Sequence, residues 1–149
     1  MGTNIYIKRI KSLHKDGTDE KNALHKLILI RTLLDYVNTN KIRSVSYYRI
    51  PLVDEDLYNF WEKEWIAHIK SSVNKSDIDE AIIELSSDSH FIYIADQKGI
   101  GINHPITSQQ YRQKAKFVKI SSGLLKLLTY SEVREIFRSC IISELDHIG

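Results

Sequence analysis

Basic and aromatic side chains stand close together in two segments of this sequence, and these are residue types that contact nucleic-acid backbones. Arg43, Tyr47 and Arg49 share one segment, and Tyr111 to Lys116 contains the second group. Lysine and arginine neutralise phosphates, and tyrosine hydroxyls form hydrogen bonds with them. His25-Lys26 adds cationic groups near the expected start of a helix, where free backbone N–H groups favour anions. The pattern indicates a protein that grips phosphates.

The distribution of charge supports this interpretation, although the net charge of the 149 residues is only +2. Residues 1–50 contain ten Lys and Arg against four Asp and Glu, whereas residues 51–90 contain three against ten. Residues 98–126 contain six basic residues and no acidic one. If the two basic blocks fold together, they form a positive face of the kind that attracts nucleic acid. The alternative is that the charges of the basic and acidic blocks mix on the folded surface and average out, so that no positive face forms.

The sequence lacks the residue constellations that catalysis requires. One cysteine and six dispersed histidines do not have the spacing of a zinc site. There is no phosphate-binding glycine loop and no nucleophile elbow. Asn103-His104-Pro105 matches a fragment of a nuclease site, but residues 98–126 offer it no acidic ligand. We therefore expect no enzymatic activity, no cofactor and no bound metal.

Two clusters of acidic residues are expected to begin helices. Asp54 to Asp56 and Asp77 to Glu80 offer carboxylates to a hard cation, but acids are also favoured in the first turn of a helix. Cys140 lies in an apolar segment and is expected to be a buried structural thiol. A lone cysteine forms no internal disulfide, which fits a reducing, cytoplasmic location. No apolar run reaches the ~18 residues of a membrane span.

One apolar stretch, Asn22 to Val37, organises the expected fold. Its apolar residues lie on nearly all sides of a helix, which is typical of a helix buried inside a domain. Arg31 interrupts the stretch, and its expected partner is either a phosphate or Asp35, four residues later. The chain is predicted to be one α+β domain spanning residues 1–149. It is mostly helical around this buried central helix, with a small antiparallel β-sheet or hairpin.

The remaining elements are placed around this helix. Trp61 and Trp65 stand four residues apart and are expected to be core residues. Residues 3–10 are ambiguous between strand and helix, and residues 41–52 are expected to be extended. Residues 77–85 form either a short helix or the first arm of a hairpin. Further helices are expected at 54–70, 108–117, 121–128 and 131–145, and a strand at 90–95.

The order of these elements resembles the recognition domain found with HNH-type restriction endonucleases. That family includes the sulfur-binding domain that recognises phosphorothioate-modified DNA. The resemblance rests on His25 to Ile30, on Arg49-Ile-Pro-Leu52, on the aromatic helix from Leu57 to Trp65, and on Ile82 to Phe91 at the place of the family's hairpin. It extends over nearly the whole chain, roughly residues 5–145.

The resemblance implies a DNA-recognition module of a modification-dependent restriction or phage-defence system. Glu80-Ala81 stands where the sulfur-binding members carry Tyr-Pro, and the HNH nuclease lobe is absent. The implied partners are double-stranded DNA, unmodified or modified, and a separate nuclease domain or subunit, with no membrane. The residues expected to contact DNA are His25, Lys26, Arg31, Arg43, Tyr47, Arg49, His90, Tyr111, Arg112, Lys114 and Lys116.

A second function, from a different class, is a protein-interaction module. An immunity or inhibitor protein often presents one charged face to the enzyme that it binds. In this chain the acidic block, residues 54–88, is the candidate for that face. A tight one-to-one complex that is unaffected by nucleic acid distinguishes this interpretation from DNA binding.

Overall fold

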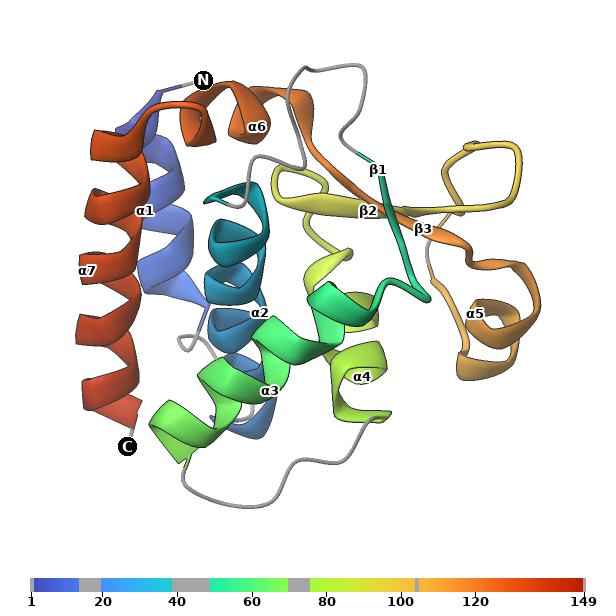
Figure 1. Ribbon diagram of the computed structural model, residues 1–149, viewed down its shortest axis with the longest axis horizontal. Coiled ribbons are helices and arrows are strands. Elements are labelled where there is room, and N and C mark those ends of the chain that lie inside the picture. The colour runs from blue at the N-terminus through green and yellow to red at the C-terminus, as the bar shows by residue number, and fades with distance from the viewer. Residues whose placement is uncertain (1, 14–19, 39–48, 70–75, 104, 149) are drawn as a thin grey trace.

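The computed structural model describes residues 2–13, 20–38, 49–69, 76–103 and 105–148. Within these ranges the chain is mostly helical with a small antiparallel sheet, which confirms the expected α+β class. In Figure 1 the helices labelled α1, α2 and α7 lie side by side, and the sheet lies to their right, between α2 and α5. In chain order the elements are α1 (Thr3–Ser12), α2 (Glu20–Asn38), β1 (Arg49–Pro51), α3 (Glu55–Ile69), α4 (Ser76–Leu85), β2 (Ile92–Ala95), α5 (Ser108–Lys114), β3 (Phe117–Ile120), α6 (Ser122–Leu128) and α7 (Ser131–Ile148).

Helix α2 is the centre of the fold, as its sequence predicts. It packs against α3, α4 and α7 (Figure 1). Side chains on all sides of α2 are buried, among them Leu27, Ile28, Leu29 and Leu34. Burial of apolar surface contributes roughly 25 cal/mol per Å². A helix that is apolar all round is therefore most stable when other elements surround it.

Two segments that the sequence leaves open are helices. Residues 3–10 belong to α1, which packs on α7. Residues 77–85 belong to α4, so the alternative of a hairpin arm is wrong. The reason is visible in the burial pattern of α4, where Ile78, Ala81, Ile82 and Leu85 are buried at helical spacing.

The hairpin that the resemblance assigns to residues 82–91 is also wrong. Leu85 ends α4, and a turn closed by the Phe91 N–H and the Asp88 carbonyl at 3.1 Å leads into β2. The hairpin of this chain lies further along, where the Ile102 N–H donates to the Ile94 carbonyl at 2.8 Å. Between those two residues lies a turn in which the Gly99 N–H donates to the Asp96 carbonyl at 2.9 Å.

The sheet has the strand order β1-β3-β2, and both strand pairs are antiparallel. Ile50, Val118 and Ile94 are aligned across the three strands and buried, so they form the inner face of the sheet. The expected extended segment 41–52 contributes β1, while residues 41–48 lie outside the described residues.

The helix expected at 108–117 is shorter than its sequence suggests. Helix α5 ends at Lys114, because Ala115 is extended with ψ at 129°. The next N–H, that of Lys116, donates to the Ala95 carbonyl at 2.8 Å. This bond places Phe117 at the start of β3 instead of at the end of a helix.

The acidic start of α3 and its tryptophans agree with the sequence. The Asp54 carboxylate accepts hydrogen bonds from the N–H groups of Asp56 at 2.8 Å and Leu57 at 3.4 Å, so it caps the helix. Trp61 is fully buried and Trp65 is 8% exposed, which confirms both as core residues.

The C-terminal part of the chain also follows its sequence. Helices α6 and α7 lie at the expected positions, and α7 continues to Ile148. Cys140 of α7 is only half-buried and packs against the core, and its burial raises the pKa of the thiol. None of the helices in the described part of the chain combines the length and the apolarity needed to cross a membrane.

Candidate nucleic-acid interface

The outer face of the sheet brings basic and aromatic residues together. Arg49, Lys119 and Tyr93 are Cα partners across β1, β3 and β2. Side chains alternate between the faces of a strand, so these three residues point away from the buried inner face. Phe117, two residues before Lys119, lies on the same outer face and is partly exposed.

Each of the two central cations is held over an aromatic ring. The guanidinium of Arg49 lies 5.0 Å from the centroid of the Phe117 ring, and the Lys119 ammonium lies 5.5 Å from that of Tyr93. Lys119 also donates a hydrogen bond to the Gly99 carbonyl at 2.8 Å. Such cation–ring contacts contribute about 0.5–1 kcal/mol at exposed sites. The rings therefore favour these positions of the charges.

An open groove beside the sheet adds three lysines. Lys98, Lys114 and Lys116 line it, together with the exposed Ile100. The groove adjoins the sheet face because Gly99, in the same turn as Lys98, accepts a hydrogen bond from Lys119, and a Cβ at Gly99 would lie 3.3 Å from the Arg49 Nη1. We call Arg49, Lys98, Lys114, Lys116 and Lys119 together the basic face.

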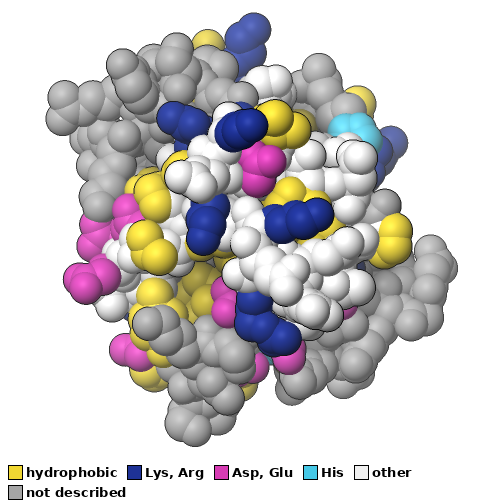
Figure 2. Space-filling model, turned by 90° about the vertical axis from the view of Figure 1, so that its right-hand side faces the viewer, with side chains coloured by type: hydrophobic (Ala, Val, Ile, Leu, Met, Phe, Trp, Pro, Cys, Tyr) yellow, Lys and Arg dark blue, Asp and Glu magenta, His cyan; other side chains and the backbone are white. Residues whose placement is uncertain are grey.

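Among the described residues, few carboxylates lie close enough to neutralise these cations. Asp96 lines the groove, but its carboxylate accepts hydrogen bonds from the N–H groups of Lys98 at 2.9 Å and Ile100 at 3.0 Å. Figure 2 shows Lys and Arg side chains spread across this side of the molecule, with most of the acidic side chains in view toward its left and lower margins. The basic face thus combines one cation of the first basic block, Arg49, with four lysines of the second.

Comparison of the chain with protein-family models and with curated protein sequences finds no significant match. The chemistry of the basic face itself therefore carries the functional argument.

Three of the expected DNA contacts belong to the basic face, namely Arg49, Lys114 and Lys116. Arg112 is exposed nearby, on the same short helix as Lys114, and lines a neighbouring pocket with Tyr111 and Ile83. Arg43 and Tyr47 lie outside the described residues, as does His104 of the supposed nuclease fragment.

His25 and Tyr111 are buried, so neither side chain is available to DNA in this fold. His25 is 1% exposed and packs against the rings of Trp61 and Trp65. It lies beyond the first turn of α2, since that helix begins at Glu20. The Tyr111 hydroxyl donates to the Asp79 carboxylate at 2.8 Å, and burial, with Asp79 beside it, raises the pKa of Tyr111.

Arg31 is paired inside the protein, and its partner is not Asp35. Its Nε donates to the Glu64 carboxylate of α3 at 2.5 Å. Asp35 accepts instead from Arg138 of α7 at 2.9 Å. Arg31 is thus used to join α2 to α3, which leaves it no role on the surface.

His90 and Lys26 lie apart from the basic face. The His90 Nδ1 is 2.9 Å from the Asp88 carboxylate, and its Nε2 is 3.4 Å from Arg9 of α1. Lys26 is partly exposed in the N-terminal half of α2, whose first turns lie at the end of that helix away from the sheet (Figure 1).

The basic face includes residues that the sequence argument missed. Lys119, Tyr93 and Phe117 were not expected at the site. A signal for them is present in Phe117-Val-Lys-Ile120, where the side chains alternate between partly exposed and buried. Four residues are too few for a periodicity to stand out, and the preceding helix was expected to include Phe117.

Proposed function

We propose that this protein binds the phosphate backbone of duplex DNA through its basic face. The observation that supports this proposal is the alignment of Arg49 and Lys119 on adjacent strands, each fixed over an aromatic ring. Cations held in place lose less conformational entropy when they bind a phosphate. The adjoining groove adds three more cations, so successive phosphates of one DNA strand can contact positive charge along a continuous surface.

The covered rings favour backbone contact over base stacking. A base that stacks on Phe117 or Tyr93 must displace the cation that already lies over that ring. Proteins that bind single strands instead offer open aromatic surfaces to successive bases. A duplex keeps its bases inside and presents phosphates, which matches what the basic face offers.

The role that we propose is recognition, with cleavage left to a separate domain or subunit. The resemblance to recognition domains of HNH-type restriction endonucleases supports a place in a modification-dependent restriction system. Glu80 does not lie in the sulfur-binding hairpin of that family, because it belongs to α4. The proposal therefore includes unmodified as well as modified duplexes.

The test is a titration of a fluorescent duplex at several salt concentrations. If each of the five cations neutralises one phosphate, the slope of log K against log salt is about −4.5, at 0.9 per phosphate. The double variant Arg49→Ala/Lys119→Ala should weaken binding at low salt and reduce the size of the slope by about 1.8. Lys8→Ala is the matched control, because Lys8 is exposed on α1, which packs on α7 instead of on the sheet.

The same titration is repeated with phosphorothioated and methylated duplexes and with a single strand. Tighter binding of one modified duplex identifies the modification that the module reads. The absence of duplex binding at low salt, for every modification, would overturn the proposal. Preference for the single strand would show that the rings are uncovered on binding.

The acidic block gives the rival proposal less support. Several of its carboxylates are used inside the fold, since Asp54 caps α3, Glu64 pairs with Arg31, Asp79 accepts from Tyr111 and Asp88 pairs with Arg9. Carboxylates that stabilise the fold are not free to grip a partner. Interaction with an enzyme through residues 54–88 stays a prediction.

A further inference from the structure

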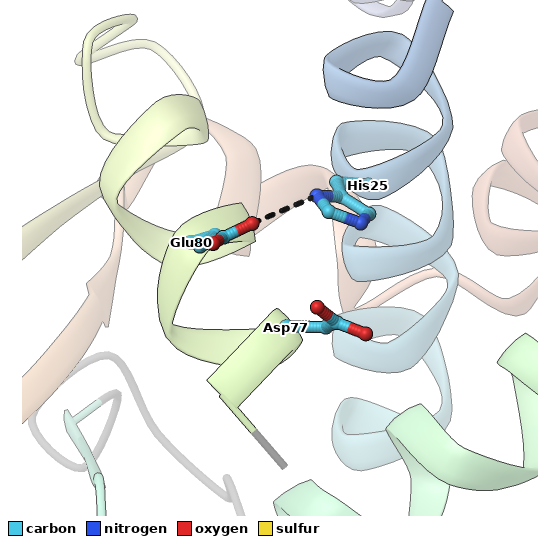
Figure 3. A group of neighbouring side chains, drawn as sticks. All are labelled: His25, Asp77 and Glu80. Atoms are coloured by element: carbon cyan, nitrogen blue, oxygen red, sulfur yellow. Dashed lines mark ion pairs between the residues drawn. The ribbon is translucent and has the colours of Figure 1, made fainter. Parts of the chain in front are cut away.

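A histidine and two carboxylates that do not belong to the basic face lie together between α2 and α4. His25 comes from α2, and Asp77 and Glu80 come from the first turn and a half of α4 (Figure 3). One nitrogen or oxygen of each side chain lies within 4.8 Å of those of the other two. The His25 Nδ1 and the Glu80 Oε2 are 3.9 Å apart, which is longer than a hydrogen bond.

The surroundings of His25 fix its ring. The imidazole packs against Trp61 at a centroid distance of 6.1 Å and against Trp65 at 5.3 Å. Metal sites in proteins generally hold their histidine ligands in one orientation through the residues behind them. Here the two tryptophans of α3 form that support. Figure 3 shows Glu80 directed toward the ring and the Asp77 carboxylate directed toward α2.

We propose that His25, Asp77 and Glu80 bind a divalent transition-metal ion, for which Zn²⁺ is the probe. One imidazole and two carboxylates are a ligand set that Zn²⁺ accepts, and three protein ligands leave a fourth position for water. The nitrogen ligand favours Zn²⁺ over Mg²⁺ and Ca²⁺, which prefer oxygen ligands alone. The ion neutralises both carboxylates and pins α4 to α2.

The distances allow the site to close. With metal–ligand bonds of about 2.0–2.1 Å, the ligand atoms of a tetrahedral zinc site lie about 3.4 Å apart. The farthest pair must therefore approach by about 1.4 Å from the present limit of 4.8 Å. The Glu80 side chain is 56% exposed, so solvent leaves room for this movement. The same exposure gives the ion a path from solvent to the buried ring.

The ordinary interpretation explains only part of this arrangement. Acids in the first turn of a helix interact favourably with its dipole, which accounts for Asp77 and Glu80 separately. An ion pair between His25 and Glu80, whose atoms are 3.9 Å apart, accounts for the position of the buried histidine beside Glu80. That pair does not include Asp77, whose ligand atom lies within 4.8 Å of both. A metal ion accounts for all three residues.

The experiment is calorimetric titration of the full chain, first treated with EDTA, with ZnCl₂ and in parallel with MgCl₂. One Zn²⁺ per chain is expected, with binding at least tenfold tighter than that of Mg²⁺ and a rise in the melting temperature. Asp77→Asn and Glu80→Gln should each weaken Zn²⁺ binding at least tenfold while the protein stays folded. His25→Gln should abolish it.

The matched control is Glu84→Gln, which removes one carboxylate from the same helix one turn beyond Glu80 and should leave Zn²⁺ binding unchanged. Absence of Zn²⁺ binding would overturn the proposal. Equal Zn²⁺ affinity in native protein, Asp77→Asn and Glu80→Gln would also overturn it, because the ion would then be held by other histidines of the chain. Neither outcome depends on DNA binding, since none of the three residues belongs to the basic face.

Discussion

Buried charges are the residues that distinguish this core from an ordinary apolar one. Glu64 of α3 is 4% exposed, accepts from Arg31 of α2, and lies 3.6 Å from the Nε2 of His68. Burial raises the pKa of Asp35, and hydrogen bonding to Glu64 raises it further. Burial acts to raise the pKa of Glu64 as well, but bonds from Asp35 and Arg31 outweigh it and lower that pKa. These side chains join α2 to α3 and, through Arg138, to α7.

The Arg31→Met variant tests this ionic group. Methionine keeps the packing of the aliphatic stem but leaves the Glu64 carboxylate buried without its cation. Loss of one partner of a buried pair costs about 3–5 kcal/mol, so a loss of that size is expected in the free energy of unfolding from urea denaturation. The control Glu135→Gln removes a carboxylate that is 76% exposed and 3.6 Å from Arg138, and its effect should stay below about 1 kcal/mol. Equal losses in both variants would contradict this account.

Among the elements, the turn between β2 and the strand-like residues 100–102 sets the geometry of the basic face. The Asp96 carboxylate accepts from two N–H groups of the turn, and Gly99 closes it with φ at 82°. A side chain at Gly99 is strained at that φ, and its Cβ would lie 3.3 Å from the Arg49 Nη1. The turn thereby couples a backbone conformation to the position of Arg49 on the basic face.

The Gly99→Ala variant is expected to lose about 1–2 kcal/mol of unfolding free energy, the cost of a left-handed conformation for an L-residue. It should also weaken duplex binding, because the added Cβ would lie 3.3 Å from the Arg49 Nη1 and 3.5 Å from the Lys119 Nζ and would displace one or both cations. Gly101→Ala serves as the control in the same hairpin, since its Cβ meets the Tyr93 ring at 3.4 Å without a positive φ. A Gly99→Ala protein as stable as the control would show that the turn tolerates a side chain.

Across the whole molecule, buried tyrosines tie separate elements together. The Tyr36 hydroxyl of α2 donates to Asp54 at 2.9 Å, and that of Tyr111 in α5 donates to Asp79 of α4 at 2.8 Å. Burial, followed by the neighbouring aspartates, raises the pKa of Tyr6, Tyr36 and Tyr111. Each keeps its proton in the folded state at a pH where the unfolded chain releases it. The stability from these groups is complete below a pH of about 10 and is lost as the pH rises further.

The free energy of unfolding should therefore fall steeply as the pH rises above about 10. Each such tyrosine lowers the free energy of unfolding by about 1.4 kcal/mol per pH unit above pH ~10, up to its pKa in the folded state. Tyr111→Phe should reduce the slope of the unfolding free energy against pH by about 1.4 kcal/mol per pH unit above pH ~10. The measurement is urea denaturation between pH 8 and 11. Tyr130→Phe, which removes a hydroxyl from a residue that is 60% exposed, should keep the native slope. An unchanged slope in Tyr111→Phe would contradict the assignment.

Local patterns alone determined much of the helical frame, although they left α1 and α4 open between helix and strand. A helix that is apolar on all sides has to be buried, so Leu27 to Val37 identified the centre of the fold. Asp54 caps α3 through contacts with the next two or three residues, which sequence spacing reveals directly. Trp61 and Trp65 were placed in the core for the same reason, since their spacing defines one helix face.

Only the tertiary structure decided which side chains meet. Arg49 and Lys119 are adjacent because distant strands pair, and no local spacing contains that register. Arg31 stands four residues from Asp35, yet Glu64 of another helix is its partner. The periodicity of a helix predicts which of its faces is apolar. Which residues contact that face depends on the element that packs against it. For the same reason His25, expected at an exposed tip, lies beneath two tryptophans and beside two carboxylates.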